Sequence, residues 1–299
     1  MKPTIAVIGS AVADIILQVP SLPKQGEDLH IQSQTMSLGG CAYNVAHILH
    51  HYKIPFLACM PVGTGIYGDF VYQELSKAGI HSIFPRTNHA NGCCYCFVEP
   101  NGERTFLSYH GAEYQITSQA MSLLHQYPIS TIYLCGLELE EATGKHIIEY
   151  VKQHPTLTIY FAPGPRFSQI KATYLEVLFH HHCILHLNQQ EAFTFTKKET
   201  MEDACLNLYN KTGQIVIITS SAQGCYTYDG NQILHVPAKS AIVTDTIGAG
   251  DSHIGAILAN RALGKDWQTS LNQANSISAA VVSVKGSTLS EDQFHQAIA

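Results

Sequence analysis

Two aspartates bracket a glycine-rich turn in the C-terminal part of this 299-residue chain. Asp245 and Asp251 flank Gly248-Ala249-Gly250, and an apolar segment with helical spacing follows directly. Backbone amides at a helix N-terminus bind anions, and glycines let those amides approach a phosphate closely. A carboxylate at this place would repel a phosphate, but it could take a proton from a hydroxyl that attacks a phosphoryl group. The stretch therefore has the residue types of a phosphoryl-transfer site, with an ordinary helix N-cap as the alternative for Asp251.

The complete string from Asp245 to Asp251 is more specific than its parts. It resembles the C-terminal signature D-T-x-G-A-G-D of the ribokinase-like (PfkB-type) carbohydrate and nucleoside kinases. Four further segments are similar to motifs of that family and follow in the family's order: Gly9-Ser10 to Asp14, Gly39-Gly40-Cys41-Ala42-Tyr43-Asn44, Asn188-Gln189-Gln190-Glu191 and Ala274-Asn275-Ser276. The resemblance covers nearly the whole chain, and the shared order argues against a chance match.

The resemblance implies a role for each of these residues. Asp251 would be the general base, and the turn Gly248-Ala249-Gly250 would stabilise charge on the transferred group. The substrate would be bound by Asp14, Gly39, Gly40, Asn44 and Asp251. The nucleotide would be bound by Asn188, Thr219, Gly224, Gly248, Gly250 and Asn275.

The resemblance also implies cofactors. ATP would be the phosphoryl donor, and Mg²⁺ would be organised by Glu191 and Asn188, partly through water. Asp245 and the carbonyl of Ile247 would lie beside a monovalent-cation site, with K⁺ as the candidate ion.

Three segments depart from the family's pattern. Gly65 stands where V-G-x-D-x-x-G has its acid, and Ala162 and Gly164 stand in a D-x-N-x-R motif of which only Arg166 is retained. The usual T-x-G is Thr219-Ser220-Ser221. These differences bear on the substrate and on nucleotide contacts, and they leave the catalytic stretch intact.

Two other patterns suggest different chemistry. Gly63, Gly65 and Gly68 spell G-x-G-x-x-G, but no clear acid ends the following strand, so tight packing is a better explanation than a dinucleotide site. His47, His50 and His51, the run His180–Cys183, and Cys93, Cys94 and Cys96 could suggest zinc. None of them has the paired C-x₂-C spacing of a structural zinc site.

Short β-rich runs alternate with helical patterns along most of the chain. This alternation predicts a three-layer α/β/α domain with a mostly parallel central sheet. The expected strands are Thr4–Gly9, Pro55–Met60, Thr131–Cys135, Leu157–Phe161, Cys183–Leu187 and Gln214–Thr219. The expected helices are Asn44–Tyr52, Asp69–Lys77, Ser118–Gln126, Gly144–Gln153 and Met201–Asn210.

Two β-rich excursions interrupt this rhythm and predict a small second sheet. Its expected strands are Ile15–Val19, Leu29–Met36, Cys93–Val98 and Glu103–Tyr109. Because ligands of open α/β sheets bind beyond the carboxyl ends of the strands, this sheet would act as a lid. Residues 12–36 and 88–112 would form the lid, and residues 1–11, 37–87 and 113–299 the catalytic domain. An exposed lid edge could pair with a second subunit in a homodimer.

Composition narrows the class of protein. An apolar fraction of 45% predicts a large core, and a net charge of −6 disfavours nucleic acids and anionic membranes as partners. No apolar run approaches the length of a membrane span, so a cytoplasmic location is expected. Nine cysteines without a regular spacing suit reduced thiols.

The resemblance therefore implies ATP-dependent phosphorylation of a hydroxymethyl group on a small sugar such as ribose or fructose. A nucleoside is the alternative acceptor, because Tyr43, Tyr95 and Phe97 could stack on a base. A non-catalytic protein that senses a nucleotide or sugar on the same fold is the alternative of a different class.

Overall fold

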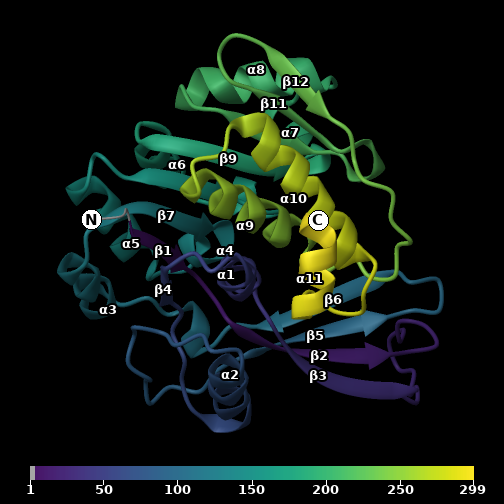
Figure 1. The fold of residues 1–299 in the computed structure, drawn as a ribbon. Helices are drawn as coiled ribbons and strands as arrows, with labels where there is room; N and C mark the ends of the chain where they lie inside the picture. Colours follow the sequence, from purple (N-terminus) through teal and green to yellow (C-terminus); the bar gives the residue numbers. More distant parts are fainter. Residues whose placement is uncertain (1–3) are drawn as a thin grey trace.

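The computed structural model describes residues 4–299 and contains a large sheet of eight strands. The strand order is β12-β11-β10-β9-β8-β7-β1-β4, and the strands from β10 to β4 pair in parallel (Figure 1). Their bounds are β1 Thr4–Ile8, β4 Phe56–Cys59, β7 Ile129–Cys135, β8 Thr158–Ala162, β9 His182–Asn188, β10 Val216–Thr219, β11 Cys225–Tyr228 and β12 Ile233–Val236. All six predicted strands are present, and the antiparallel β11 and β12 are additional to them.

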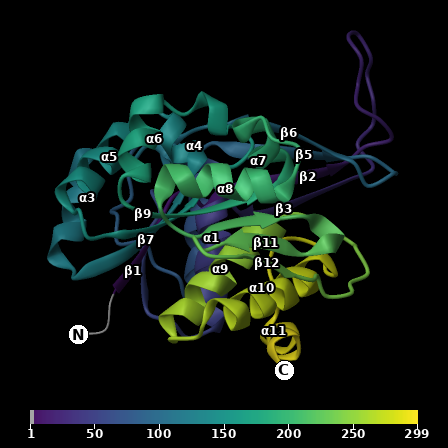
Figure 2. The ribbon, with the colours of Figure 1, turned by 90° about the horizontal axis from the view of Figure 1, so that it is seen from above.

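Helices cover both faces of this sheet (Figure 2). Successive residues of β1 explain why: Ile5 and Val7 join one apolar core, whereas Ala6 and Ile8 join the other. A strand buried on both faces reads as a continuous apolar run, as the predicted strands do. The predicted three-layer architecture is therefore confirmed.

The helices have the following bounds: α1 Cys41–His51, α2 Gly65–Lys77, α3 Ser118–Ser122, α4 Gly136–Glu140, α5 Gly144–Gln153, α6 Ala172–Phe179, α7 Gln189–Thr196, α8 Met201–Thr212, α9 Ala249–Ala262, α10 Trp267–Val282 and α11 Glu291–Ile298. Helices α1, α9, α10 and α11 share one core, and α5, α6 and α8 share the other. The predicted helix Ser118–Gln126 is divided into α3 and a 3₁₀ turn at Leu123–Gln126.

The start of α1 differs from the prediction. The helix begins at Cys41 and not at Asn44, because Gly40, with φ of 101°, forms the N-cap. Asn44 is therefore a residue of the first helical turn, with its side chain buried. The tight fit of Gly63 and Gly68 agrees with a packing role for that motif, because a Cβ on Gly68 would lie 2.6 Å from the Gly63 carbonyl oxygen.

The predicted small sheet is also present, in the order β3-β2-β5-β6. Its strands are β2 Val12–Gln18, β3 Ser33–Gly39, β5 Cys93–Val98 and β6 Arg104–Tyr109. Both N-terminal strands are shifted from their predicted bounds, and β3 continues to Gly39 at the start of α1. The segment between β2 and β3 projects away from the body (Figure 2).

Side-chain alternation separates the two faces of this small sheet. Asp14 pairs directly with Cys94, and Ile16, Cys96 and Val98 form a cluster on the same face. Tyr95 faces the other way and its hydroxyl lies 3.2 Å from that of Tyr67 on α2. Within residues 4–299, no helix is long and apolar enough to cross a membrane.

Candidate active site

The glycine turn leads into helix α9 as the sequence predicts. Gly248 is the N-cap, with φ of 73°, and a Cβ at this position would lie 2.5 Å from the Cβ of Ser287. Only glycine fits both the backbone conformation and the space. Asp251 is the third residue of the helix, so it is not the N-cap. Within the described chain, the amides of Gly250 and Asp251 donate to no acceptor, as is usual for a first helical turn.

The carboxylate of Asp251 is held by a residue from a different helix. Nδ2 of Asn44 donates to Oδ2 of Asp251 at 2.8 Å, and the Ser287 hydroxyl donates to Oδ1 of Asn44 at 2.8 Å. The serine thereby fixes the orientation of the Asn44 amide. Burial raises the pKa of Asp251 to about 6, although hydrogen bonds from Asn44 and Cys41 oppose this shift. A carboxyl group with this pKa is suited to accept a proton near neutral pH.

Asp14 lies close enough to Asp251 for the two charges to interact. Burial and the charge of Asp251 together raise the pKa of Asp14 to about 7. Its carboxylate rests on Gly39, where a Cβ would lie 1.9 Å from Oδ2. A Cβ on Gly40 would meet the Ser10 carbonyl oxygen at 2.6 Å. The four residues predicted to bind substrate are thus brought together with Asp251 at the start of α1.

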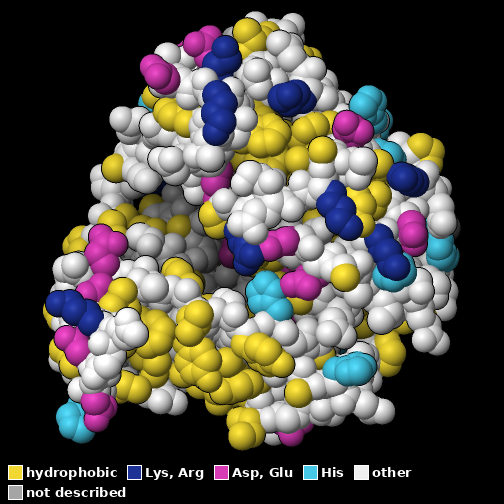
Figure 3. Space-filling view, turned by 180° about the vertical axis from the view of Figure 1, so that it is seen from behind, with side chains coloured by type: hydrophobic (Ala, Val, Ile, Leu, Met, Phe, Trp, Pro, Cys, Tyr) yellow, Lys and Arg dark blue, Asp and Glu magenta, His cyan; other side chains and the backbone are white. Residues whose placement is uncertain are grey.

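Glu138 is a residue of this region that sequence reasoning missed. It lies in α4, directly after β7, and it is 1% exposed. Its Oε1 accepts a hydrogen bond from the amide of Ser10 at 2.8 Å, whereas Oε2 has no partner within residues 4–299. Burial raises the pKa of this carboxyl group. Its position after a parallel strand was the available signal, because such strand ends carry the ligand site. The molecular surface is deeply hollowed on one face (Figure 3).

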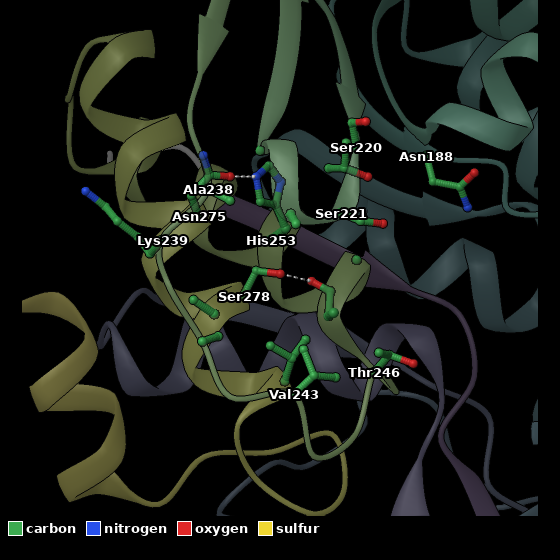
Figure 4. A pocket seen from close by; sticks show the side chains of 18 of the residues that line it. Asn188, Ser220, Ser221, Ala238, Lys239, Val243, Thr246, His253, Asn275 and Ser278 are labelled. Atoms are coloured by element: carbon green, nitrogen blue, oxygen red, sulfur yellow. Dashed lines mark hydrogen bonds between the residues drawn. The ribbon is translucent and has the colours of Figure 1, made fainter. Parts of the chain in front are cut away.

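A cleft of about 900 Å³, whose lining does not include Asp14, Asn44 or Asp251, borders the N-terminus of α9 (Figure 4). Five residues predicted to bind nucleotide line it, namely Asn188, Thr219, Gly224, Gly250 and Asn275. The volume is in the range of sites that take a drug-sized ligand. Because Ala249 and Gly250 line the same cleft, it reaches the free amides of the helix.

Asn275 is fully engaged by other protein groups. Its Nδ2 donates to the carbonyl oxygens of Val236 and Pro237, and its Oδ1 lies 3.0 Å from Nε2 of His253 (Figure 4). Since Nδ2 of Asn275 donates, Oδ1 must accept, and His253 therefore carries its proton on Nε2. Nδ1 of His253 then accepts from Nε2 of the buried His186 at 2.9 Å. This series of hydrogen bonds, which was not predicted from the sequence, fixes the part of the cleft wall that follows β12.

Asn188 and Glu191 form a capping box at the start of α7. Oδ1 of Asn188 accepts from the amide of Glu191 at 2.8 Å, and Oε2 of Glu191 accepts from the amide of Asn188 at 3.0 Å. Burial raises the pKa of Glu191. The described residues contain no group of three His, Cys, Asp or Glu side chains that could hold a metal alone. The second carboxylate oxygen of Glu191 accepts no hydrogen bond from a described residue, so it could bind Mg²⁺. This ion usually keeps several waters and is bound by one or two carboxylates plus phosphates.

Asp245, at the other end of the turn, accepts hydrogen bonds from three donors. Oδ1 accepts from the amide of Ile247 at 2.9 Å, and Oδ2 accepts from the amide of Gly286 at 2.9 Å. Oδ2 also pairs with Nη2 of Arg104 at 2.7 Å. The charge that the resemblance assigns to a monovalent-cation site is therefore already balanced by a guanidinium.

Comparison with known proteins places this geometry in a wider context. The family model described as "pfkB family carbohydrate kinase" matches residues 2–293. An uncharacterized sugar kinase of Escherichia coli (strain K12) is 29% identical over 95% of this chain and 90% of its own length. Two solved structures share the fold. Arabidopsis thaliana ribokinase complexed with ribose and ATP has a TM-score of 0.80 at 20% identity, covering 100% of this chain and 99% of its own. Adenosine kinase from Sinorhizobium meliloti has a TM-score of 0.86 at 19% identity, covering 99% of both chains.

Proposed function

This chain belongs to the pfkB family of carbohydrate kinases, and from that premise we propose that it transfers the γ-phosphoryl group of ATP to a hydroxymethyl group of a small sugar, such as ribose or fructose. One observation carries the proposal. Asp251, with a pKa raised to about 6, lies in the first turn of α9 between the Asp14–Asn44 group and the cleft that reaches Gly250. A proton acceptor and free backbone amides thus adjoin one point, as phosphoryl transfer requires.

Asp251 acts on the acceptor in this mechanism. Asp14, Asn44 and the glycines at 39 and 40 bind the sugar hydroxyls, and Asp251 takes the proton of the hydroxymethyl group as its oxygen attacks the γ-phosphorus. The hydrogen bond that the Asn44 side-chain amide donates to Asp251 keeps this carboxylate turned toward the acceptor. The helix N-terminus at Ala249 and Gly250 stabilises the negative charge on the transferred phosphoryl group.

The nucleotide binds in the 900 Å³ cleft, with its phosphates toward Gly250. The ATP in the Arabidopsis thaliana ribokinase structure supports this choice of donor. Glu191 and Asn188 would hold Mg²⁺, partly through water, and the ion would neutralise negative charge on the phosphate groups. Asn275 acts here by fixing the cleft wall, because its own donors and acceptor are occupied.

A nucleoside is the second candidate acceptor. The orientation of side chains on the lid weakens the original argument for it, which was stacking of a base on Tyr43, Tyr95 and Phe97. Tyr95 and Phe97 alternate away from Asp14, and Tyr43 is 6% exposed, so none of them lies free beside the acceptor. Phe106 pairs with Cys96, on the face of Asp14, and is 53% exposed. The exposed ring of Phe106 could stack on the base of a nucleoside, which is the observation that favours this acceptor.

The lid also offers a surface for a homodimer. Strand β6 is an edge of the small sheet, and its Leu107 and Tyr109 are 62% and 68% exposed. Exposed apolar side chains on an unpaired edge favour pairing with a second sheet. Sedimentation of the purified protein, with Leu107→Lys as the disrupting variant, tests this proposal.

The kinase is tested by ADP release from Mg-ATP against a panel of sugars and nucleosides. Turnover with a sugar, lost in Asp251→Asn, is the expected result. Turnover with nucleosides alone would replace the sugar by the second candidate. Binding of ATP and of an acceptor, without turnover of any acceptor, would support the sensor instead.

A further inference from the structure

The lid and the phosphate-binding turn meet at an ion pair that the proposed mechanism does not use. Arg104 is the first residue of β6, whereas Asp245 precedes the glycine turn. The Arg104 side chain is 15% exposed and that of Asp245 is 1% exposed. A carboxylate buried to this degree requires a compensating charge, and Arg104 is the cation that pairs with it in the described chain.

The contacts around this pair extend in both directions. On the lid side, Nη1 of Arg104 donates to Sγ of Cys96 at 3.6 Å, and Ile247 packs against the cluster of Ile16, Cys96 and Val98. The glycine turn therefore touches the lid through an ion pair and through an apolar contact.

On the catalytic side, Asp245 accepts the amide of Gly286, and the next residue, Ser287, donates to Asn44. Asn44 in turn donates to the base, Asp251. The Cβ of Ser287 also lies 2.5 Å from where a Cβ on Gly248 would be, so the same loop packs against the helix N-cap. A continuous set of contacts thus runs from Arg104 to both the anion-binding turn and the base.

We propose that Arg104 is a positioning residue that supplies the positive charge of the Asp245 site from the lid, so that the glycine turn is ordered by lid docking and turnover needs no added monovalent cation. A monovalent cation beside Asp245 does not fit the groups present, because the guanidinium already balances the carboxylate charge and, with the Gly286 amide, fills Oδ2, whereas Oδ1 accepts the Ile247 amide and keeps one lone pair. The inference rests on the proposed kinase function, but the charge balance at Asp245 does not depend on the acceptor.

Two variants of different volume test this proposal. Arg104→Ala removes the charge and leaves space, whereas Arg104→Met removes the charge but fills the space. Turnover and thermal unfolding are measured in KCl, in NaCl and in tetramethylammonium chloride at equal ionic strength. Arg261→Ala, at the far end of α9, is the control for loss of an arginine.

The wild-type protein should have equal turnover in all three salts. Both variants should lose roughly 10²-fold in tetramethylammonium chloride, the scale expected when reacting groups are misplaced by about 1 Å. K⁺ should restore Arg104→Ala and not Arg104→Met, and it should raise the unfolding temperature of Arg104→Ala alone. A merely structural role for Arg104 would not separate the two variants by cation.

Several-fold activation of the wild type by K⁺, or an equal response of both variants to K⁺, would overturn the inference. If the alanine variant does not fold, Arg104→Lys replaces it, and retention of salt-independent turnover by this variant is expected. If no acceptor is phosphorylated, the kinase proposal fails while the unfolding temperatures still decide the role of Arg104.

Discussion

The two aspartates that flank the glycine turn have opposite environments. Asp245 accepts hydrogen bonds from two backbone amides and pairs with Arg104, so the charge of its carboxylate is compensated. Asp251 accepts a hydrogen bond from the side-chain amide of Asn44, and burial raises its pKa to about 6. It also lies close to a second carboxyl group, that of Asp14. A carboxylate whose charge is paired stabilises structure, whereas a buried carboxylate without a paired cation can take a proton. The same residue type thus has two roles within one turn.

Removal of the paired carboxylate of Asp245 should have the largest effect. Asp245→Ala leaves a buried guanidinium and two amides without acceptors, so it should lower the free energy of unfolding by about 3 to 5 kcal/mol in urea titrations. Asp69→Ala is the matched control, because Asp69 pairs with Arg86 at a side-chain exposure of 59%, and it should cost less than about 1 kcal/mol. Equal losses in the two variants would contradict a structural role for Asp245.

Removal of the carboxylate of Asp251 should act on chemistry. Asp251→Asn should reduce turnover roughly 10²-fold or more, because the substrate hydroxyl loses its proton acceptor. Calorimetric titration should show nucleotide binding close to that of the wild type. Asp266→Asn, a surface N-cap that retains its capping oxygen, should leave turnover unchanged. Near-normal turnover in Asp251→Asn would refute the assignment of the base.

The same substitution should increase stability. The pKa of Asp251 is about 6 in the folded chain against 3.8 for the free side chain, so the folded protein binds the proton more tightly. The stabilisation from that proton is complete below about pH 4 and is lost as the pH rises through 6. One unit of pKa is worth about 1.4 kcal/mol, so Asp251→Asn should be more stable than the wild type by about 1 to 3 kcal/mol at pH 8. Urea unfolding at pH 4 and pH 8 checks this, and a constant difference would contradict it.

The smallest expected effect concerns the hydrogen bond from Asn44. Turnover of the wild type should fall about tenfold per unit as the pH drops below about 6, because protonated Asp251 cannot act as a base. Asn44→Ala removes a donor that lowers this pKa, so the midpoint of the pH profile should rise by about one unit. Ser287→Ala, which only frees the Asn44 amide, should shift the midpoint less. An unchanged midpoint in Asn44→Ala would show that the amide does not tune the base.

Structural features that depend on residues close together in the sequence were predictable. The strands of the large sheet followed from apolar runs, and the turn from Gly248 to Asp251 followed from glycines placed before a helical pattern. Asn188 and Glu191 form a capping box between residues three apart, a local pattern that we did not predict. The start of α1 was predicted three residues late, because a glycine with positive φ forms its N-cap and no side-chain signal marks it.

The sequence by itself determined the layered α/β architecture, the second small sheet and the segment that carries Asp251, because these depend on periodicity and on local turn chemistry. Only the tertiary structure decided what each carboxylate contacts. Four hydrogen-bonded or ion-paired contacts each link residues more than one hundred positions apart: Asn44 with Asp251, Ser287 with Asn44, Arg104 with Asp245, and Ser10 with Glu138. Such pairs leave no periodic signal, since they depend on how parallel strands bring their ends to one edge and on the reach of each side chain. The turn's two acids look alike in the sequence, and the fold makes one a structural anchor and leaves the other free to react.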